Sequence, residues 1–408
     1  MTGSKKLERL RFSVIVASHH RPSWLQRCLT SLRQLDHDAF EIVVVADSHS
    51  LSALTGDAFK RVAFDLPNIS QARNAGIAVA AGDICAFIDD DAVPEPLWLK
   101  HLEHAFHATG AAAVVGYVRG RNGISFQSRV ASVDAEGETH QEHTIEEAPA
   151  IPDLKAGRAL KLVGTNAAFR KDVLEKLNGF DPAYTFYLDD SDISLRLERS
   201  GFKAAVAPLA EVHHAFAPSS RRTALRAPTH LGDIGRSSAV YLRRHNGIGE
   251  TELFERLQVR EQARLVRHMV QGTCEPRDVQ QLMHGLRQGW QAGLSMDLPE
   301  IKLPEDDKYP FMRVKRIKGH QILNSRLLRR RALLSEANAL AESGRRVSFF
   351  SFSLTPVRHL VRYSGSGVWV QTGGQFGRTD RNGPVFKWCR FANRMDAEIR
   401  RVAKQRGI

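Results

Sequence analysis

The first third of the chain alternates short apolar runs with longer amphipathic stretches, and this alternation restricts the fold more than any other feature. Residues 12–18 (FSVIVAS) have the length and composition of a buried strand. Residues 22–35 follow with apolar side chains on one helical face, and residues 41–48 (EIVVVADS) give a second strand. Repeated strand–helix units of this kind predict a parallel sheet with helices packed against it.

A second set of such units follows directly. Residues 61–67 predict a short strand, residues 69–82 a helix that ends at a glycine, and residues 84–89 (ICAFID) a third full strand. We therefore expect an α/β fold with a doubly wound, mostly parallel, Rossmann-like sheet, in which ligands bind beyond the carboxyl ends of the strands. The turn after the first strand, SHHRPS, lacks the GxGxxG pattern, so a bound nucleotide needs another means of holding its phosphates.

Three consecutive carboxylates, Asp89, Asp90 and Asp91, follow the third full strand. Adjacent carboxylates repel one another and lose hydration at the end of a buried strand, so a divalent cation or fixed hydrogen-bond donors must compensate them. An acidic turn that stops the strand and caps the next helix is the alternative interpretation. Asp47 also falls at the carboxyl end of a predicted strand.

A second acidic cluster, Asp189, Asp190 and Asp192, lies in the segment YLDDSDISLRL. Carboxylates at the start of a helix interact favourably with its N-terminal dipole, so a capped amphipathic helix would account for them. A positioned carboxylate can also act as a general base in an enzyme reaction. The residues alone leave both interpretations open.

The charge balance favours an anionic partner. The chain carries 58 Lys and Arg against 45 Asp and Glu, and its basic runs crowd the second half. A phosphate-bearing substrate or an anionic membrane surface would suit them, whereas no nucleic-acid partner is expected because zinc-finger spacing and RNA-binding aromatic signatures are missing.

The sequence also predicts the cellular compartment of the protein. No apolar run approaches the roughly 20 residues that span a bilayer, and the N-terminal segment does not resemble a signal peptide. The four cysteines are scattered without a pairing motif, as in proteins with reduced thiols. We expect a cytoplasmic protein that can touch the inner face of the cell membrane.

Several segments, in this order, resemble family 2 glycosyltransferases of the GT-A fold. They are SVIVASHHRPSWLQRCLTSL, EIVVVADS, NISQARNAGIAVAAGDICAFIDDDAVP, VGTNAAFRKDVLEKLNGFDPAY and YLDDSDISLRLERSGFKAAVAPLAEVHH. The resemblance implies a metal-dependent, inverting enzyme that moves a sugar from a nucleoside diphosphate of the UDP, dTDP or GDP type to a hydroxyl. A glycan or a lipid-linked acceptor in the synthesis of a surface polysaccharide or glycolipid is the implied partner.

The resemblance also assigns roles to individual residues. Asp190 matches the catalytic base, supported by Asp189. Asp91 matches the direct ligand of Mn²⁺ or Mg²⁺, with Asp89 as its partner and His213 as a third ligand, for which His214 is the close alternative. Donor and acceptor contacts are assigned to Ser18, Asp47, Arg73, Asp89, Asp90, Gly164, Thr165, Asn166 and Asp192. The chain departs from the family in having Ala46 before Asp47, where two aspartates are common, which puts base recognition in doubt.

The resemblance spans roughly residues 12–245, so we expect residues 1–245 to form the glycosyltransferase domain. Within it, the acidic stretch 134–153 lacks periodicity and predicts a mobile loop over the site. Residues 246–294 predict a helical extension and residues 295–312 a linker that contains prolines. Residues 313–408 predict a basic C-terminal accessory module with α/β character, since roughly 100 residues are few for a second transferase domain.

Two other functions stay open from the residues. The chain can be a nucleotide-sugar or glycan-binding protein whose catalytic residues are vestigial. It can also be a phosphatase of the haloacid-dehalogenase type, which carries a similar acidic motif after an apolar strand and would use Asp89 as its nucleophile.

Overall fold

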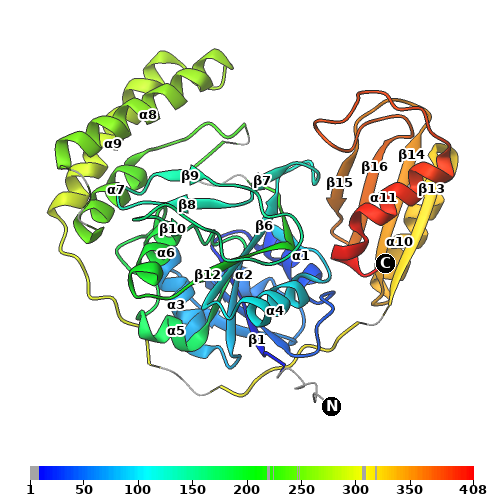
Figure 1. The fold of residues 1–408 in the computed structure, drawn as a ribbon, viewed down its shortest axis with the longest axis horizontal. Coiled ribbons are helices and arrows are strands. Elements are labelled where there is room, and N and C mark those ends of the chain that lie inside the picture. Colours follow the sequence, from blue (N-terminus) through cyan, green and yellow to red (C-terminus); the bar gives the residue numbers. More distant parts are fainter. Residues whose placement is uncertain are drawn as a thin grey trace.

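The computed structural model describes most of the chain, namely residues 9–217, 221–223, 225–245, 247, 249–305, 309–317 and 319–408. Figure 1 shows a large sheet flanked by helices, a helical extension, and a smaller α/β unit formed by the C-terminal residues. The predicted fold class, a mostly parallel α/β sheet with a helical extension and a small C-terminal α/β module, is confirmed.

The N-terminal half of the large sheet is parallel. β1 (Phe12–Ser18) lies between β2 (Phe40–Ala46) and β4 (Ile84–Asp89), and β3 (Lys60–Ala63) pairs with the outer edge of β2. β1, β2 and β4 are nearly continuous runs of apolar residues buried on both faces, the pattern that a covered parallel sheet requires. β2 ends two residues earlier than predicted because Asp47 caps the short helix α2 (Ser48–Ser52).

Helices pack on both faces of this sheet. α1 (Pro22–Leu32) and α4 (Trp98–Thr109) share one apolar core with the side chains of alternate strand residues. α3 (Ile69–Val79), α5 (Lys171–Lys176) and α6 (Asp189–Arg199) share a second core on the opposite face. Because strand side chains alternate between the two faces, the central strands are buried on both faces and their accessible polar groups lie at the strand ends.

The second half of the sheet contains antiparallel strands. β11 (Ala167–Arg170) runs antiparallel between β4 and β6 (Ala113–Arg119), and β12 (Ala204–His214) lies parallel to β6. The end of β12 pairs with the short strand β5 (Ala92–Pro94), which places His214 opposite Ala92. The last residues of β12 therefore lie beside the triple aspartate.

The stretch 134–153, predicted to lack regular structure, is partly folded. β8 (Ala131–Val133), β9 (Thr139–Gln141) and β10 (Ala159–Leu160) form a three-stranded antiparallel sheet, and Ala150 bridges to Val206 of β12. The prediction is wrong over this hairpin because β9 is short and polar, so no apolar periodicity marks it in the sequence. Whether the stretch moves on ligand binding stays a prediction.

Three helices make up the extension, α7 (Gly232–His245), α8 (Glu250–Val270) and α9 (Pro276–Ser295). α7 and α9 are in backbone contact, since a Cβ on Gly289 would lie 2.0 Å from the carbonyl oxygen of Gly232. α7 also packs against β8, β10 and α6 through residues such as Tyr241. α7 thus connects the extension to the three-stranded sheet and α6.

The C-terminal module is a four-stranded sheet with helices α10 (Arg330–Glu342) and α11 (Phe391–Arg406). Its strands, in spatial order, are β13 (His320–Arg326), β14 (Arg346–Ser353), β16 (Val368–Gly374) and β15 (Leu360–Tyr363). The α/β character predicted for this module is confirmed.

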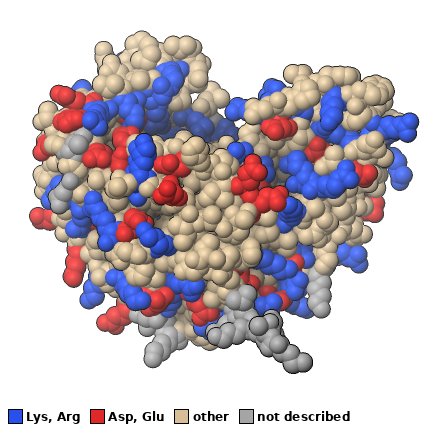
Figure 2. Space-filling model, in the orientation of Figure 1, with Lys and Arg blue, Asp and Glu red and all other residues tan. Residues whose placement is uncertain are grey.

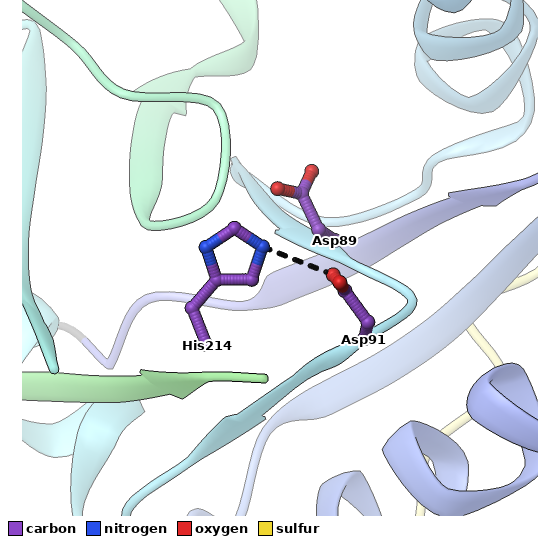
Figure 3. Close-up of side chains that lie close together, drawn as sticks. All are labelled: Asp89, Asp91 and His214. Atoms are coloured by element: carbon purple, nitrogen blue, oxygen red, sulfur yellow. Dashed lines mark ion pairs between the residues drawn. The ribbon is translucent and has the colours of Figure 1, made fainter. Parts of the chain in front are cut away.

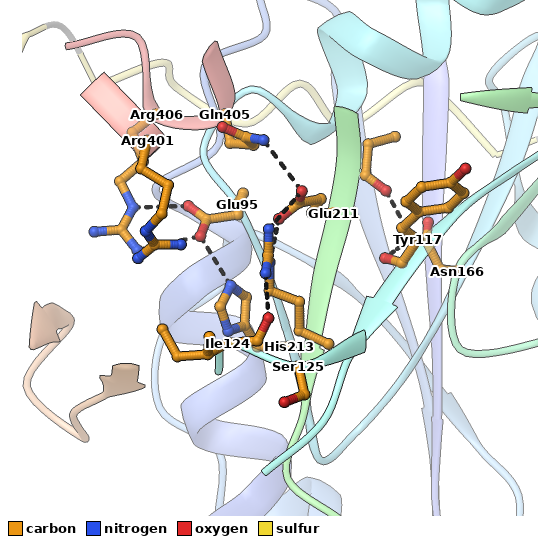
Figure 4. Close-up of polar contacts among 12 residues, drawn as sticks. Glu95, Tyr117, Ile124, Ser125, Asn166, Glu211, His213, Arg401, Gln405 and Arg406 are labelled. Atoms are coloured by element: carbon orange, nitrogen blue, oxygen red, sulfur yellow. Dashed lines mark hydrogen bonds and ion pairs between the residues drawn. The ribbon is translucent and has the colours of Figure 1, made fainter. Parts of the chain in front are cut away.

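A buried ion pair joins this module to the large sheet. Arg406, at the end of α11, lies 2.9 Å from Glu95, and the exposed fractions of the two side chains are 1% and 2% (Figure 4). Beside it, the backbone N–H of Leu97 donates to the carbonyl oxygen of Gln405. Burial alone would raise the pKa of Glu95, but Arg406 and His213 hold it well below its usual range.

We predict that Arg406→Ala destabilises the chain by about 3–5 kcal/mol, because it leaves the Glu95 carboxylate buried without its main counterion. Arg400→Ala, which removes an exposed arginine from the same helix, should change the free energy of unfolding by no more than about 0.5 kcal/mol. Urea unfolding followed by circular dichroism measures both. Equal effects of the two replacements would contradict the structural role of the pair.

Candidate functional site

The carboxyl ends of β1, β2 and β4 meet at one edge of the large sheet. Ser18 ends β1 opposite Ala46 of β2, and Ala17 pairs with Asp89 at the end of β4. This edge collects the side chains that follow each strand, as expected for a doubly wound sheet.

Asp89, Asp91 and His214 form a compact cluster at this edge (Figure 3). One potential ligand atom from each residue lies within 4.8 Å of the others, and Nε2 of His214 lies 3.1 Å from Oδ1 of Asp91. The other Asp91 oxygen accepts a hydrogen bond from the backbone N–H of Ala217 at 2.7 Å. The pairing of β12 with β5 brings the histidine to the aspartates.

The charges of this cluster suit a cation. Burial would raise the pKa of Asp91, but His214, Arg21 and the N–H of Ala217 lower it to about 2. Asp91 is therefore ionised at neutral pH although its exposed fraction is only 3%. Two carboxylates and one imidazole are a donor set that Mn²⁺ or Mg²⁺ can accept, with room for oxygen ligands from a bound molecule.

The sequence-based preference for His213 over His214 does not fit this arrangement. The Nε2 atom of His213 lies 2.8 Å from Glu95 (Figure 4). The ring centroid of His213 lies 4.8 Å from that of Trp369. Burial lowers the pKa of His213, although Glu95 opposes this shift. His213 thus belongs to the contact with the C-terminal module, since adjacent residues of a strand face opposite sides.

Glu95, Glu211 and His213 are also close enough together to hold a metal. Both carboxylates are already neutralised, because Arg406 pairs with Glu95 and Arg119 pairs with Glu211. Only the cluster of Asp89, Asp91 and His214 combines metal-binding geometry with incompletely compensated charge within the described part of the chain.

Asp90, the middle aspartate, is fully buried and has a structural role. It accepts a hydrogen bond from Ser18 Oγ at 2.6 Å and lies 2.5 Å from an Nη atom of Arg21. Burial raises the pKa of Asp90 to about 7, although Arg21 and Ser18 oppose the shift. A carboxylate in this position holds the loop after β1 against the end of β4 and does not face an open site.

Arg73 links the two acidic clusters. Its guanidinium pairs with Asp189 and lies 3.8 Å from Asp89. Gly164 permits this approach, because a Cβ there would lie 2.1 Å from Arg73 Nη2. The hydroxyl of Thr165 donates a hydrogen bond to Asp89. The structure therefore brings together most of the predicted site residues, from segments far apart in the sequence.

The three aspartates of α6 have different surroundings. Asp189 is buried against Arg73, and burial together with Asp190 raises its pKa to about 6 despite that arginine. Asp192 is fully buried, 2.8 Å from Arg196 and 2.9 Å from His245. Asp190 is half-buried, and its carboxylate contacts only the Ser191 hydroxyl, at 3.3 Å, among the residues the structure describes.

The residues before this helix have unusual backbone angles. Tyr187 and Leu188 have φ values of 72° and 67°, in the left-handed region that non-glycine residues seldom adopt. Two such residues in succession cost free energy and persist where the surrounding fold enforces them, often at functional sites. They set the direction in which α6 begins and hence where Asp189 and Asp190 point.

Three residues assigned to substrate contact instead support the fold. Asp47 is 1% exposed and accepts hydrogen bonds from the backbone N–H groups of Ser50 and His20. Asn166 is fully buried, where it accepts from the Trp98 indole at 2.8 Å and donates to the carbonyl oxygen of Ala210. Asp192, as described above, is enclosed by Arg196 and His245. The substrate contacts assigned to these three residues stay predictions, since the sequence does not show which polar groups already have partners.

The sequence interpretation missed an arginine-rich wall beside the cluster. Arg226 lies 4.0 Å from the centre of the Phe216 ring, which in turn lies 4.3 Å from the His214 ring. Burial and the neighbouring arginines 222, 121 and 264 lower the pKa of Arg226 to about 10. Figure 2 shows Lys and Arg gathered in the hollow between the helical extension and the C-terminal module. The basic residues after β12 are visible in the sequence, but the sequence does not show that they lie beside the cluster.

Comparison with known proteins agrees with the resemblance. Residues 13–178 match the model of the family described as Glycosyl transferase family 2. Pre-mycofactocin glycosyltransferase of Mycobacterium tuberculosis is 28% identical over 228 residues, which cover 52% of this chain and 43% of that protein. Succinoglycan biosynthesis protein ExoM of Rhizobium meliloti is 35% identical over 128 residues, 28% of this chain and 41% of that protein.

Among solved structures, S. aureus TarS 1–349 in complex with UDP-GlcNAc has a TM-score of 0.40 at 16% identity, covering 60% of this chain and 69% of that one. GalNAc-T7 with UDP, GalNAc and Mn²⁺ has a TM-score of 0.42 at 15% identity, covering 57% of this chain and 48% of that one. The chain spans about half or less of the length of the curated relatives it matches. The resemblance to family 2 glycosyltransferases is confirmed for residues 13–178.

None of the described helices is long and apolar enough to cross a membrane.

We predict that replacement of His213 and replacement of His214 have different effects. His214→Ala should weaken Mn²⁺ binding at least about tenfold, as expected for loss of a ligand. His213→Ala should leave Mn²⁺ affinity unchanged but cost about 1–3 kcal/mol of stability, since Glu95 loses a buried partner. Titration of Mn²⁺ followed by electron paramagnetic resonance, together with thermal unfolding, measures both quantities. If His213→Ala weakened Mn²⁺ binding and His214→Ala did not, His213 would be the metal ligand instead of His214.

Proposed function

We propose that the chain is a metal-dependent, inverting glycosyltransferase that moves a sugar from a nucleoside diphosphate to a hydroxyl acceptor. The observation that carries this proposal is the cluster of Asp89, Asp91 and His214 at the carboxyl edge of a sheet whose sequence matches family 2. The similarity to ExoM, a succinoglycan biosynthesis protein, supports a glycan or lipid-linked acceptor in surface-polysaccharide synthesis. A cytoplasmic location with peripheral membrane contact belongs to the same proposal.

Asp89, Asp91 and His214 would hold Mn²⁺ or Mg²⁺. A bound divalent cation neutralises the diphosphate of the donor and so favours its departure as leaving group. The residues around the cluster keep the ligands in place: Thr165 donates to Asp89, and the backbone N–H of Ala217 donates to Asp91. Arg21 is close enough to limit the repulsion between Asp90 and Asp91.

The arginine-rich wall supplies further positive charge on the side of His214 away from β4. No carboxylate pairs with Arg226 in the described ranges, and its guanidinium is held against Phe216. Neighbouring arginines repel one another, and an anion that lies between them stabilises the group. We assign this wall to the phosphate oxygens of the donor.

Asp190 is the proposed general base. Its carboxylate is half-buried and makes no ion pair in the described residues, so it is available to accept the proton of an acceptor hydroxyl. Asp189 holds Arg73 in place, which makes it a positioning residue. Transfer by direct attack of the hydroxyl on the anomeric carbon inverts the configuration and needs only this one carboxylate.

We predict that Asp190→Asn retains binding of the donor while transfer falls by about 10²- to 10⁴-fold, the usual contribution of a general base. Release of nucleoside diphosphate from a panel of UDP-, dTDP- and GDP-sugars with Mn²⁺ measures turnover, and calorimetry measures donor binding. Asp172→Asn, an exposed carboxylate on α5, is the matched control and should behave as wild type.

The same panel separates this function from its alternatives. A binding protein with vestigial catalytic residues would bind donor but release no diphosphate, with or without Asp190. A phosphatase would release inorganic phosphate from simple phosphate esters and depend on Asp89. Undiminished sugar transfer by Asp190→Asn would contradict the assignment of the base.

A further inference from the structure

A cavity of about 440 Å³ lies between the large sheet and the C-terminal module, beside the candidate metal cluster. Three separate parts of the chain line it: residues 119–130 around β7 (Phe126–Ser128), residues 141–144 after β9, and residues 379–382 with Arg401 of the C-terminal module. The cavity therefore exists only while the module is docked.

The lining is rich in guanidinium groups. Arg119, Arg129, Arg381 and Arg401 line the cavity, against the carboxylates of Glu142 and Asp380. Arg119 and Arg401 are held in place from behind by Glu211 and Glu398, at 2.8 Å and 2.9 Å. Arg129 and Arg381 are exposed, and neither pairs with a carboxylate in the described ranges. The charge in the cavity that is not compensated by an ion pair is therefore positive.

The remaining lining suits a sugar chain. The Phe126 ring lies between two of the arginines, 4.1 Å from Arg119 and 4.5 Å from Arg129, which fixes both guanidiniums in direction. Around it lie short polar side chains that can bond to hydroxyl groups. They are Ser125, Gln127, Ser128, Gln141, Thr144, Thr379 and Asn382. Guanidiniums bind planar oxyanions, while hydroxyl and amide groups match the neutral parts of a glycan.

One residue joins this cavity to the candidate metal cluster. Gln127 lines the cavity, and its Oε1 lies 3.0 Å from Nδ1 of His214. A molecule that fills the cavity is consequently one side chain away from a proposed metal ligand. A growing chain held there could place its terminal hydroxyl in the catalytic site.

We propose that the cavity binds an acidic glycan, one that carries carboxylate or phosphate groups, as the already assembled part of the acceptor. The C-terminal module thereby completes the acceptor site. The acceptor role rests on the proposed glycosyltransferase function, whereas binding of the glycan can be measured without donor or metal.

The experiment compares three probes with the full-length chain by calorimetry, in the absence of donor and metal: an oligogalacturonate, a phosphorylated oligomannose and a neutral maltooligosaccharide. At least one acidic probe should bind at least about tenfold more tightly than the neutral one. Combined Arg129→Ala and Arg381→Ala should weaken that binding at least about tenfold, because two charge-assisted contacts are lost. Arg400→Ala, an exposed arginine outside the lining, should bind as wild type.

The carboxylate and phosphate probes identify the acidic group. The double variant keeps the buried contacts between module and sheet, so its unfolding temperature should match wild type. Failure of both acidic probes to bind, or equal binding by the double variant, would overturn the proposal. If the wild-type chain transfers sugar to simple hydroxyl acceptors but binds neither acidic glycan, the proposal for the cavity is wrong and the proposed function stands. If it binds an acidic glycan but transfers no sugar, the proposed function alone is wrong.

Discussion

Three adjacent carboxylates coexist at the end of β4 because each has a different compensating partner. Asp90 is buried against Ser18 and Arg21, Asp91 faces His214 and a backbone N–H, and Asp89 contacts Thr165 near Arg73. Two buried or half-buried acids of this kind would otherwise raise one another's pKa and one would become neutral. The loop after β1, the turn before β11 and the end of β12 must all be in place to supply those partners. The candidate site is therefore a product of the whole sheet and not of the acidic motif alone.

The same physical constraint attaches the C-terminal module. Glu95 and Glu211 are buried carboxylates with arginine partners, and the partner of Glu95 is Arg406, 311 residues further along the chain. A buried ion pair adds little net stability compared with an apolar contact, but an unpaired buried charge is costly. The pairing therefore specifies where the end of α11 docks more than it strengthens the fold, and the docked position is what encloses the cavity at β7.

Local patterns in the sequence were sufficient for β1, α1, β2, α3 and β4, because buried strands and amphipathic helices have distinct periodicities that do not depend on distant residues. The resemblance assigned Arg73, Asp89, Asp189 and the VGTN segment to one site, but neither it nor the spacing predicted that Arg73 pairs with Asp189 or that Thr165 donates to Asp89. The surroundings of individual polar groups and the short strand β9 could not be predicted. Asp47 and Asn166 are polar residues already satisfied by their surroundings, and β9 is too short and polar to show a period. Arg21 and Gln127 became visible as site residues only once the strands were paired.

The choice between His213 and His214 shows this limit most clearly, and it also shows how the site and the module are coupled. The register between β12 and β6 shifts between Ala207 and Glu211, so counting alternate residues from the buried start of the strand does not predict which histidine faces the aspartates. Pairing of β12 with β5 decides it. His214 then faces Asp91, while His213 turns to Glu95 and Trp369. Neighbouring residues of one strand therefore contact the candidate metal cluster and the docked module, so both depend on the position of the same backbone segment.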